Sequence, residues 1–132
     1  AQSDSYLAII QELYRVCKPD AVVRIVVPHP RQDSFLSDPT HVRAITPQGL
    51  DLSSQAKTRE WAAKGNSNTP LGLYLGVDFE ITAVDMKPDE PWRGQLQARR
   101  ITPQDLAQAM RQYNNVIREI DIRLRAVKAA AP

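Results

Sequence analysis

The side chains best suited to chemistry in this sequence lie in one polar segment that follows an apolar run. The five that we single out are His29, Asp38, Thr40, His41 and Arg43. Because histidine changes protonation near neutral pH, His41 is the candidate catalytic residue, a general base for a poor nucleophile. The other four are candidate substrate-binding residues, and Arg43 is suited to an anionic group because guanidinium can form two parallel hydrogen bonds to it.

Each of these assignments has a structural alternative. His41 could instead tie the segment down through hydrogen bonds, and Arg43 could form an ion pair with Asp38. His29 lies between two prolines in a stiff segment. The two histidines are 12 residues apart, which fits no usual ligand spacing for zinc, so we predict no metal site.

The elements that would position this segment are a helix and a strand. A helix is predicted from Ser3 to Cys17, with Asp4 or Ser3 as its cap, because apolar residues recur there at helical spacing. Lys18-Pro19 ends the helix, since proline disfavours helical geometry in the residue before it. The apolar run Val22–Val27 then predicts a strand buried on both faces, with Arg24 weakening that expectation near its start.

Later in the chain we expect two more strands and a long C-terminal helix. Alternating polarity predicts a strand over Val77–Met86, and a weaker strand is expected over Gln95–Ile101. Thr102-Pro103 is a typical helix start. Seven apolar residues then alternate spacings of four and three: Leu106, Met110, Tyr113, Ile117, Ile120, Leu124 and Val127. This heptad seam predicts a helix that packs either on its own domain or on another helix, within or between chains.

Composition limits the class of protein. The 132 residues suffice for one domain, and 42% apolar with 24% charged residues is typical of soluble globular proteins. A net charge of +2 without a basic run argues against nucleic-acid binding, and no apolar stretch approaches the roughly 20 residues of a membrane span. Cys17, the single cysteine, excludes an internal disulfide and fits a reducing compartment, so we expect a cytoplasmic protein.

Three blocks of sequence resemble class I S-adenosylmethionine-dependent methyltransferases. Residues 12–21, which read ELYRVCKPDA, resemble the join between the fourth helix and the fifth strand of that family's seven-stranded, doubly wound sheet. The second block, VPHP (27–30) followed by DPTHVR (38–43), is similar to the loop after the fifth strand in one group of small bacterial and archaeal members. Residues 113–128 resemble that group's C-terminal helix.

The resemblance implies an α/β fold in which residues 1–132 form a single partial domain, the C-terminal portion of that sheet. The full-length protein would transfer a methyl group from S-adenosylmethionine to a small-molecule or sugar-like acceptor. Members of the family hold the cofactor with a Gly-rich loop and an acidic residue, whereas none of the five glycines here forms G-x-G. We therefore expect the cofactor-binding half to be missing and the fragment itself to be inactive and not to bind the cofactor.

The alternative function is a non-catalytic dimerisation or interaction module built on the C-terminal heptad helix. A homodimer is expected on either view. The heptad seam provides one surface for it, and the strand Val22–Val27, without the neighbour that the missing half would supply, provides an unpaired edge.

Overall fold

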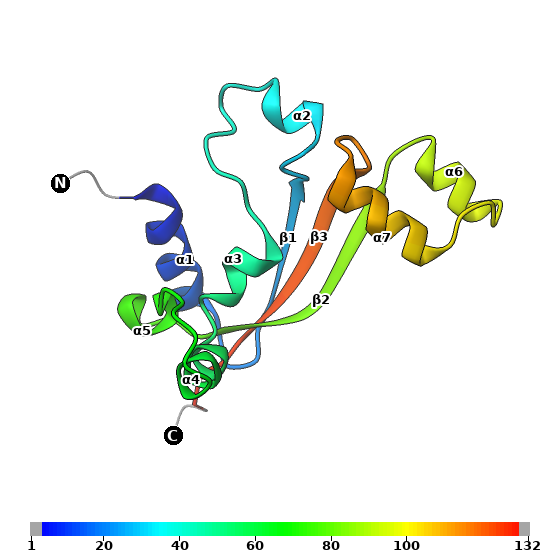
Figure 1. The fold of residues 1–132 in the computed structure, drawn as a ribbon. Coiled ribbons are helices and arrows are strands. Elements are labelled where there is room, and N and C mark those ends of the chain that lie inside the picture. The colour runs from blue at the N-terminus through cyan, green and yellow to red at the C-terminus, as the bar shows by residue number, and fades with distance from the viewer. Residues whose placement is uncertain (1–3, 130–132) are drawn as a thin grey trace. The chain divides into compact units, whose positions relative to one another are not determined.

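The computed structural model describes residues 4–129 as a mixed α/β protein (Figure 1). The chain divides into two units, each of which takes part of every strand. The first contains residues 4–24, 47–83 and 123–129 of the described chain, and the second contains residues 25–46 and 84–122. None of the described helices combines the length and the hydropathy needed to cross a bilayer.

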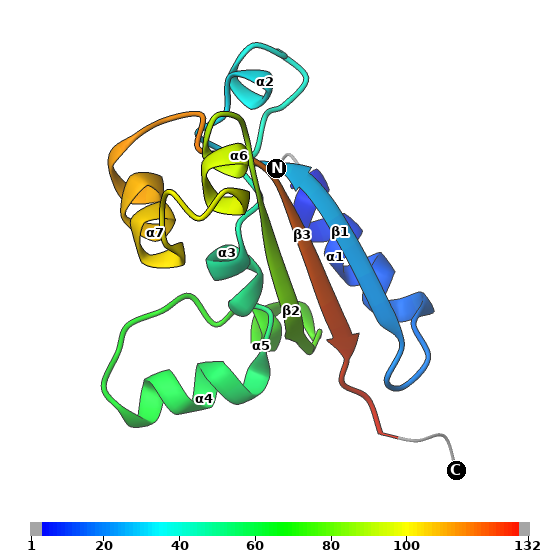
Figure 2. The same ribbon diagram turned by 90° about the vertical axis from the view of Figure 1, so that its right-hand side faces the viewer.

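Among the described residues, three strands form the sheet. They are β1 (Val22–Pro28), β2 (Phe79–Pro88) and β3 (Ile117–Ala126), in the order β1-β3-β2 (Figure 2). β3 runs antiparallel to both neighbours, as backbone hydrogen bonds show from Ala126 to Ala21 (2.9 Å), Val127 to Asp78 (2.8 Å), His29 to Arg118 (3.2 Å) and Asp89 to Val116 (2.8 Å). β1 and β2 are therefore parallel to each other.

In the first unit, the helices are α1 (Ser5–Val16), α3 (Pro47–Asp51), α4 (Gln55–Ala63) and α5 (Leu71–Leu75). Of the two predicted caps of α1, Ser3 lies outside the described residues. Asp4 is confirmed, since its carboxylate accepts hydrogen bonds from the backbone N–H groups of Tyr6 and Leu7. At the other end of α1, Lys128 Nζ donates to the carbonyl of Cys17 (2.6 Å). Buried apolar side chains in this unit are Ile10, Leu50, Val77, Phe79, Leu124 and Ala126.

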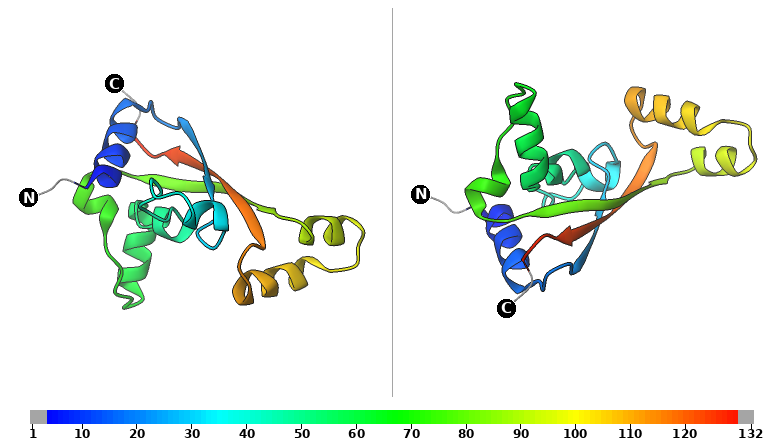
Figure 3. Two further views of the ribbon diagram at one scale, coloured as in Figure 1. Left: turned by 90° about the horizontal axis from the view of Figure 1, so that it is seen from above. Right: turned by 90° about the horizontal axis from the view of Figure 1, so that it is seen from below.

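The second unit contains α2 (Asp33–Leu36), α6 (Trp92–Gln97) and α7 (Pro103–Gln112). α6 and α7 follow β2 and lie side by side (Figure 3). The predicted start of α7 is confirmed, because Thr102 and Asp105 cap each other's backbone N–H groups. Ala109, Val116 and Ile117 form a buried cluster, against which Met86, Trp92, Leu106 and Met110 pack.

The expected long C-terminal helix is wrong. α7 ends at Gln112, Asn115 takes a left-handed φ of 61°, and residues 117–126 form β3. The residues Ile120, Ile122, Leu124 and Ala126 are each at most 1% exposed, so burial recurs every second residue there. The heptad spacing was misleading because Ile120 and Leu124 fit both a helical seam and one face of a strand.

The expected strand over Gln95–Ile101 is also wrong. α6 extends to Gln97, and Arg99 takes a left-handed φ of 57° after the helix. The polar–apolar alternation of residues 95–98 does not continue through Arg99 and Arg100, so the segment lacks the full alternation that marks a half-buried strand. The third strand of the sheet is instead β3.

β1 lies where it was predicted, but the expectation that it is buried on both faces is wrong. Val22 is 68% exposed and Val26 is 45% exposed, and exposure alternates along β1, so one face of this strand is uncovered in the described chain. β2 begins two residues later and ends two residues later than the predicted Val77–Met86.

Candidate functional site

The predicted site residues lie in the second unit, on the segment that follows β1. Figure 1 shows this segment leaving the carboxyl end of β1, passing through α2 and returning toward α3. The carboxyl end of the parallel strand β2 also belongs to this unit. The carboxyl ends of the parallel strands β1 and β2 therefore lie in the same unit as the predicted site residues.

A hollow of about 340 Å³ lies beside the segment. Its lining residues are Val27, Pro28, Phe35, Thr40, His41, Val42, Arg43 and Ile45. The structure therefore brings Thr40, His41 and Arg43 to one hollow. Its volume falls at the small end of the range of roughly 300–1,000 Å³ that holds small-molecule ligands.

His41 is held by its neighbours in a defined orientation. Its Nδ1 lies 3.2 Å from the carbonyl oxygen of Phe35, and its ring stacks on the Phe35 ring at 5.5 Å and 15°. Its Nε2 lies 3.7 Å from Asp38 Oδ2. When Nδ1–H donates to the Phe35 carbonyl, Nε2 is the nitrogen that can accept a proton. The hydrogen bond that ties His41 to Phe35 therefore leaves Nε2 available for the general-base role.

Asp38 shapes the turn before His41. Its Oδ1 accepts hydrogen bonds from the backbone N–H of Thr40 (2.9 Å) and from the Thr40 hydroxyl (2.7 Å), an arrangement typical of an Asx turn. The Thr40 hydroxyl, then the Thr40 backbone N–H and the nearby His41, lower the pKa of Asp38. Asp38 is thus an anion that orients Thr40 and faces Nε2 of His41.

His29 lies at the end of β1 and is not among the residues that line this hollow. Its Nδ1 accepts a hydrogen bond from the backbone N–H of Arg31 (3.1 Å). Burial lowers the pKa of His29, and the charge of Arg31 adds to this effect. These contacts give His29 a place in the turn that leaves β1.

Two polar contacts that the sequence analysis did not find hold the turn after β1. Gln32, only 9% exposed, donates from Nε2 to Asp89 Oδ2 (2.9 Å). This bond, together with the backbone N–H of Glu90, lowers the pKa of Asp89. Asn115 Oδ1 accepts from the backbone N–H of Asp33 (2.9 Å). No local pattern marks these residues, because their partners are 57 and 82 positions away.

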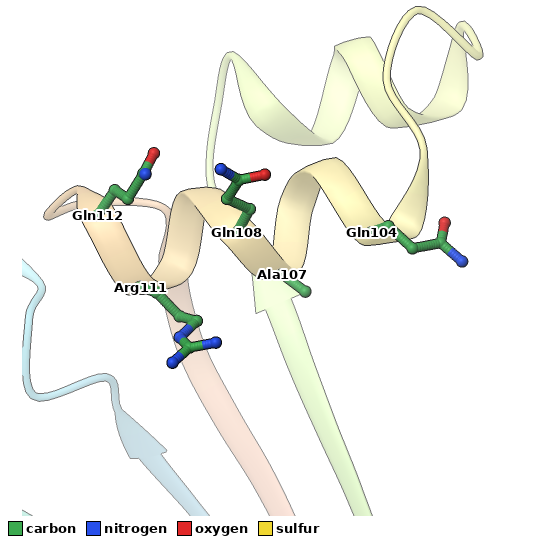
Figure 4. A pocket seen from close by; sticks show the side chains of 5 residues that line it. All are labelled: Gln104, Ala107, Gln108, Arg111 and Gln112. Atoms are coloured by element: carbon green, nitrogen blue, oxygen red, sulfur yellow. The ribbon is translucent and has the colours of Figure 1, made fainter.

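A second hollow, of about 530 Å³, lies along α7. All five lining residues, Gln104, Ala107, Gln108, Arg111 and Gln112, come from that one helix (Figure 4). Figure 4 shows Gln108 and Gln112 on one side of the helix, Ala107 and Arg111 on the other, and Gln104 near its start. They do not converge on a point, so this surface lacks the geometry of a binding site.

The glycines of this chain do not provide the loop that holds S-adenosylmethionine in the resembled family. Gly49, Gly72 and Gly94 lie within α3, α5 and α6, and Gly65 and Gly76 follow α4 and α5. None of them follows the carboxyl end of a strand.

Within residues 4–129, no group of three or more His, Cys, Asp or Glu side chains is placed to hold a metal ion.

Comparison of the chain with protein-family models, with curated proteins and with solved structures finds no match.

Proposed function

We propose that this chain is the acceptor-binding part of a class I S-adenosylmethionine-dependent methyltransferase. The observation that carries the proposal is the strand order β1-β3-β2, in which β3 runs antiparallel between two parallel strands. The sheet of the resembled family ends in the same way, with its last strand returning between the fifth and sixth. On this assignment, β1, β2 and β3 are the fifth, sixth and seventh strands.

The connection from α1 to β1 supports the same assignment. Asp20 takes a left-handed φ of 65° in the turn after Lys18-Pro19. Glycine is common at this position in the resembled family, and glycine adopts this conformation readily. Asp is among the few other residues that tolerate it, so the turn keeps its geometry here with a different residue.

On the acceptor side, the segment after β1 supplies the reacting groups. His41 Nε2 would take the proton of an acceptor hydroxyl or amine, with Nδ1 fixed by the Phe35 carbonyl. The Asp38 carboxylate, 3.7 Å away, would stabilise the imidazolium that results. Thr40 and Arg43 line the same hollow and would position the acceptor.

The residues of this chain do not fit the cofactor, because within residues 4–129 no Gly-rich loop follows a strand. On this proposal, the cofactor binds residues other than these 132. The alternative function, a dimerisation module, depended on a continuous helix through Val127. Since residues 117–126 form β3, that support is absent.

The test begins with the reading frame upstream of Ala1. We expect it to encode a strand followed by G-x-G and then an acidic residue. The extended protein should bind S-adenosylmethionine at micromolar concentration in isothermal titration calorimetry, and the 132-residue chain should not. Cofactor binding by the short chain, or none by the extended protein, would contradict the proposal.

A variant tests His41 within the extended protein. His41→Ala should lower the methyl-transfer rate about 10²–10⁴-fold, as loss of a general base does, without changing cofactor affinity. The rate is measured by transfer of labelled methyl groups, and the affinity by the same calorimetry. An unchanged rate would leave His41 with only its structural role.

A further inference from the structure

We infer that the hollow beside residues 35–45 binds a small planar aromatic molecule with a hydroxyl group, in preference to a sugar. That this molecule is the methyl acceptor rests on the proposed function. Binding itself requires no cofactor, so it can be tested on the 132-residue chain.

The chemistry of the lining favours an apolar ligand. Five of the eight lining side chains are apolar, namely Val27, Pro28, Phe35, Val42 and Ile45. The polar lining residues, Thr40, His41 and Arg43, all come from one short stretch. A sugar carries hydroxyl groups around its whole ring, and each loses hydrogen bonds to water when it meets an apolar wall. An aromatic ring with one hydroxyl needs polar partners on one side only.

The shape of the lining favours a planar ligand. Phe35 and His41 both line the hollow, and their rings are stacked nearly parallel, with an angle of 15° between them, so a third ring could extend this stack or meet its edge. Aromatic rings prefer offset stacking or edge-to-face contact with other rings. Val42 lines the same hollow and is 90% exposed, so a bound ring would shield an apolar side chain that water now surrounds.

The polar stretch can satisfy one hydroxyl. The Thr40 hydroxyl donates its hydrogen to Asp38, which leaves its oxygen able to accept a hydrogen bond from a ligand. His41 Nε2 can accept in the same way when Nδ1 carries the proton. The volume of about 340 Å³ suits a ligand of one or two rings.

The experiment is a nitrogen–proton NMR titration of the 132-residue chain with p-cresol, cyclohexanol and methyl α-glucopyranoside. p-Cresol should shift the amide signals of residue 35 and residues 40–43 in a saturable way. Cyclohexanol, which has the hydroxyl without the flat ring, should bind about tenfold more weakly, a difference of about 1.4 kcal/mol. The glucoside should cause no saturable shift at these residues.

Three variants locate the binding. Phe35→Leu keeps an apolar side chain but removes the flat face, and should weaken p-cresol binding about tenfold. Val42→Asp places a charge at an exposed position and should weaken p-cresol binding without unfolding the chain. Tyr113→Leu is the matched control, because it removes a ring stacked on Trp92 outside the hollow and should leave the affinity unchanged.

The inference would be overturned if the glucoside bound at residues 40–43. It would also be overturned if p-cresol shifted amide signals outside the hollow and only Tyr113→Leu weakened that binding. Absence of saturable p-cresol binding would also overturn it, while leaving the cofactor test of the extended protein unaffected. If p-cresol binds as expected and the extended protein fails to bind S-adenosylmethionine, the proposed function fails alone and the aromatic site stands.

Discussion

The two histidines have the same side chain but different surroundings in the second unit. His41 has Nδ1 near a carbonyl oxygen and Nε2 facing the Asp38 carboxylate. His29 instead accepts a backbone hydrogen bond at Nδ1, which requires that nitrogen to be unprotonated. Burial lowers the pKa of His29, so its neutral form is the one that the fold favours. We therefore propose the proton-accepting role for His41, whereas the contacts of His29 fix the turn after β1.

The lowered pKa of His29 predicts a pH dependence of stability. Because the unfolded chain binds the proton more readily, the free energy of unfolding should fall as pH falls from about 6.5, the ordinary histidine pKa, through the lower pKa of the folded state. The slope for one proton is at most about 1.4 kcal/mol per pH unit. His29→Asn should remove this contribution, since the Asn oxygen can accept from the Arg31 N–H without titrating.

The free energy of unfolding is measured by urea unfolding, followed by tryptophan fluorescence, at neutral pH and at about pH 5.5. His41→Asn, which replaces the other histidine, is the matched control. Equal acid sensitivity of the natural chain and of His29→Asn would show that His29 does not contribute.

At the scale of elements, β3 is the strand that the apolar spacing did not predict. Ile122 is fully buried, yet it lies off the heptad seam from Leu106 to Val127. Val127 lies on that seam but comes after the end of β3. The two residues therefore distinguish a strand from a helix in this part of the chain.

Ile122→Ala should lower the free energy of unfolding by about 2–4 kcal/mol, because it leaves a cavity in the core. Val127→Ala should change it by less than about 1 kcal/mol, because this partly exposed side chain lies outside the core. Chemical denaturation of both variants measures the difference. A larger loss for Val127→Ala than for Ile122→Ala would indicate that the helical seam is real.

At the scale of the whole molecule, the predicted homodimer now depends on the sheet edge instead of a helical seam. β1 is an edge strand of the described sheet, and its Val22 and Val26 side chains are exposed. An exposed edge strand with β-branched side chains pairs readily with another chain. The dimer stays a prediction, with β1 as its proposed surface.

Val26→Lys should convert the dimer to a monomer, because lysine on an edge strand discourages pairing with another strand. Sedimentation velocity at tens of micromolar measures the change. Val84→Lys makes the same substitution on β2, at a residue of similar exposure (40% against 45%), and should leave the dimer intact. A natural chain that sediments as a monomer would contradict the predicted dimer, and dissociation by Val84→Lys alone would move the interface to β2.

Features that depend on neighbouring residues could be predicted from the sequence. The stripe and Asp4 cap of α1, the apolar run of β1, and the Thr102 cap of α7 all arise from interactions within a few positions. The segment that carries Thr40, His41 and Arg43 was found in the same way, from residue types and its place after a strand.

Whether residues 117–126 form a helix or a strand could not be predicted from the sequence, because their apolar spacing suits both. β3 is a strand because backbone partners around residues 21–29 and 78–89 pair with it, and those partners are distant in sequence. The Gln32–Asp89 bond and the exposed face of β1 were also beyond prediction. Each depends on which remote segment lies opposite, which local patterns of residues do not specify.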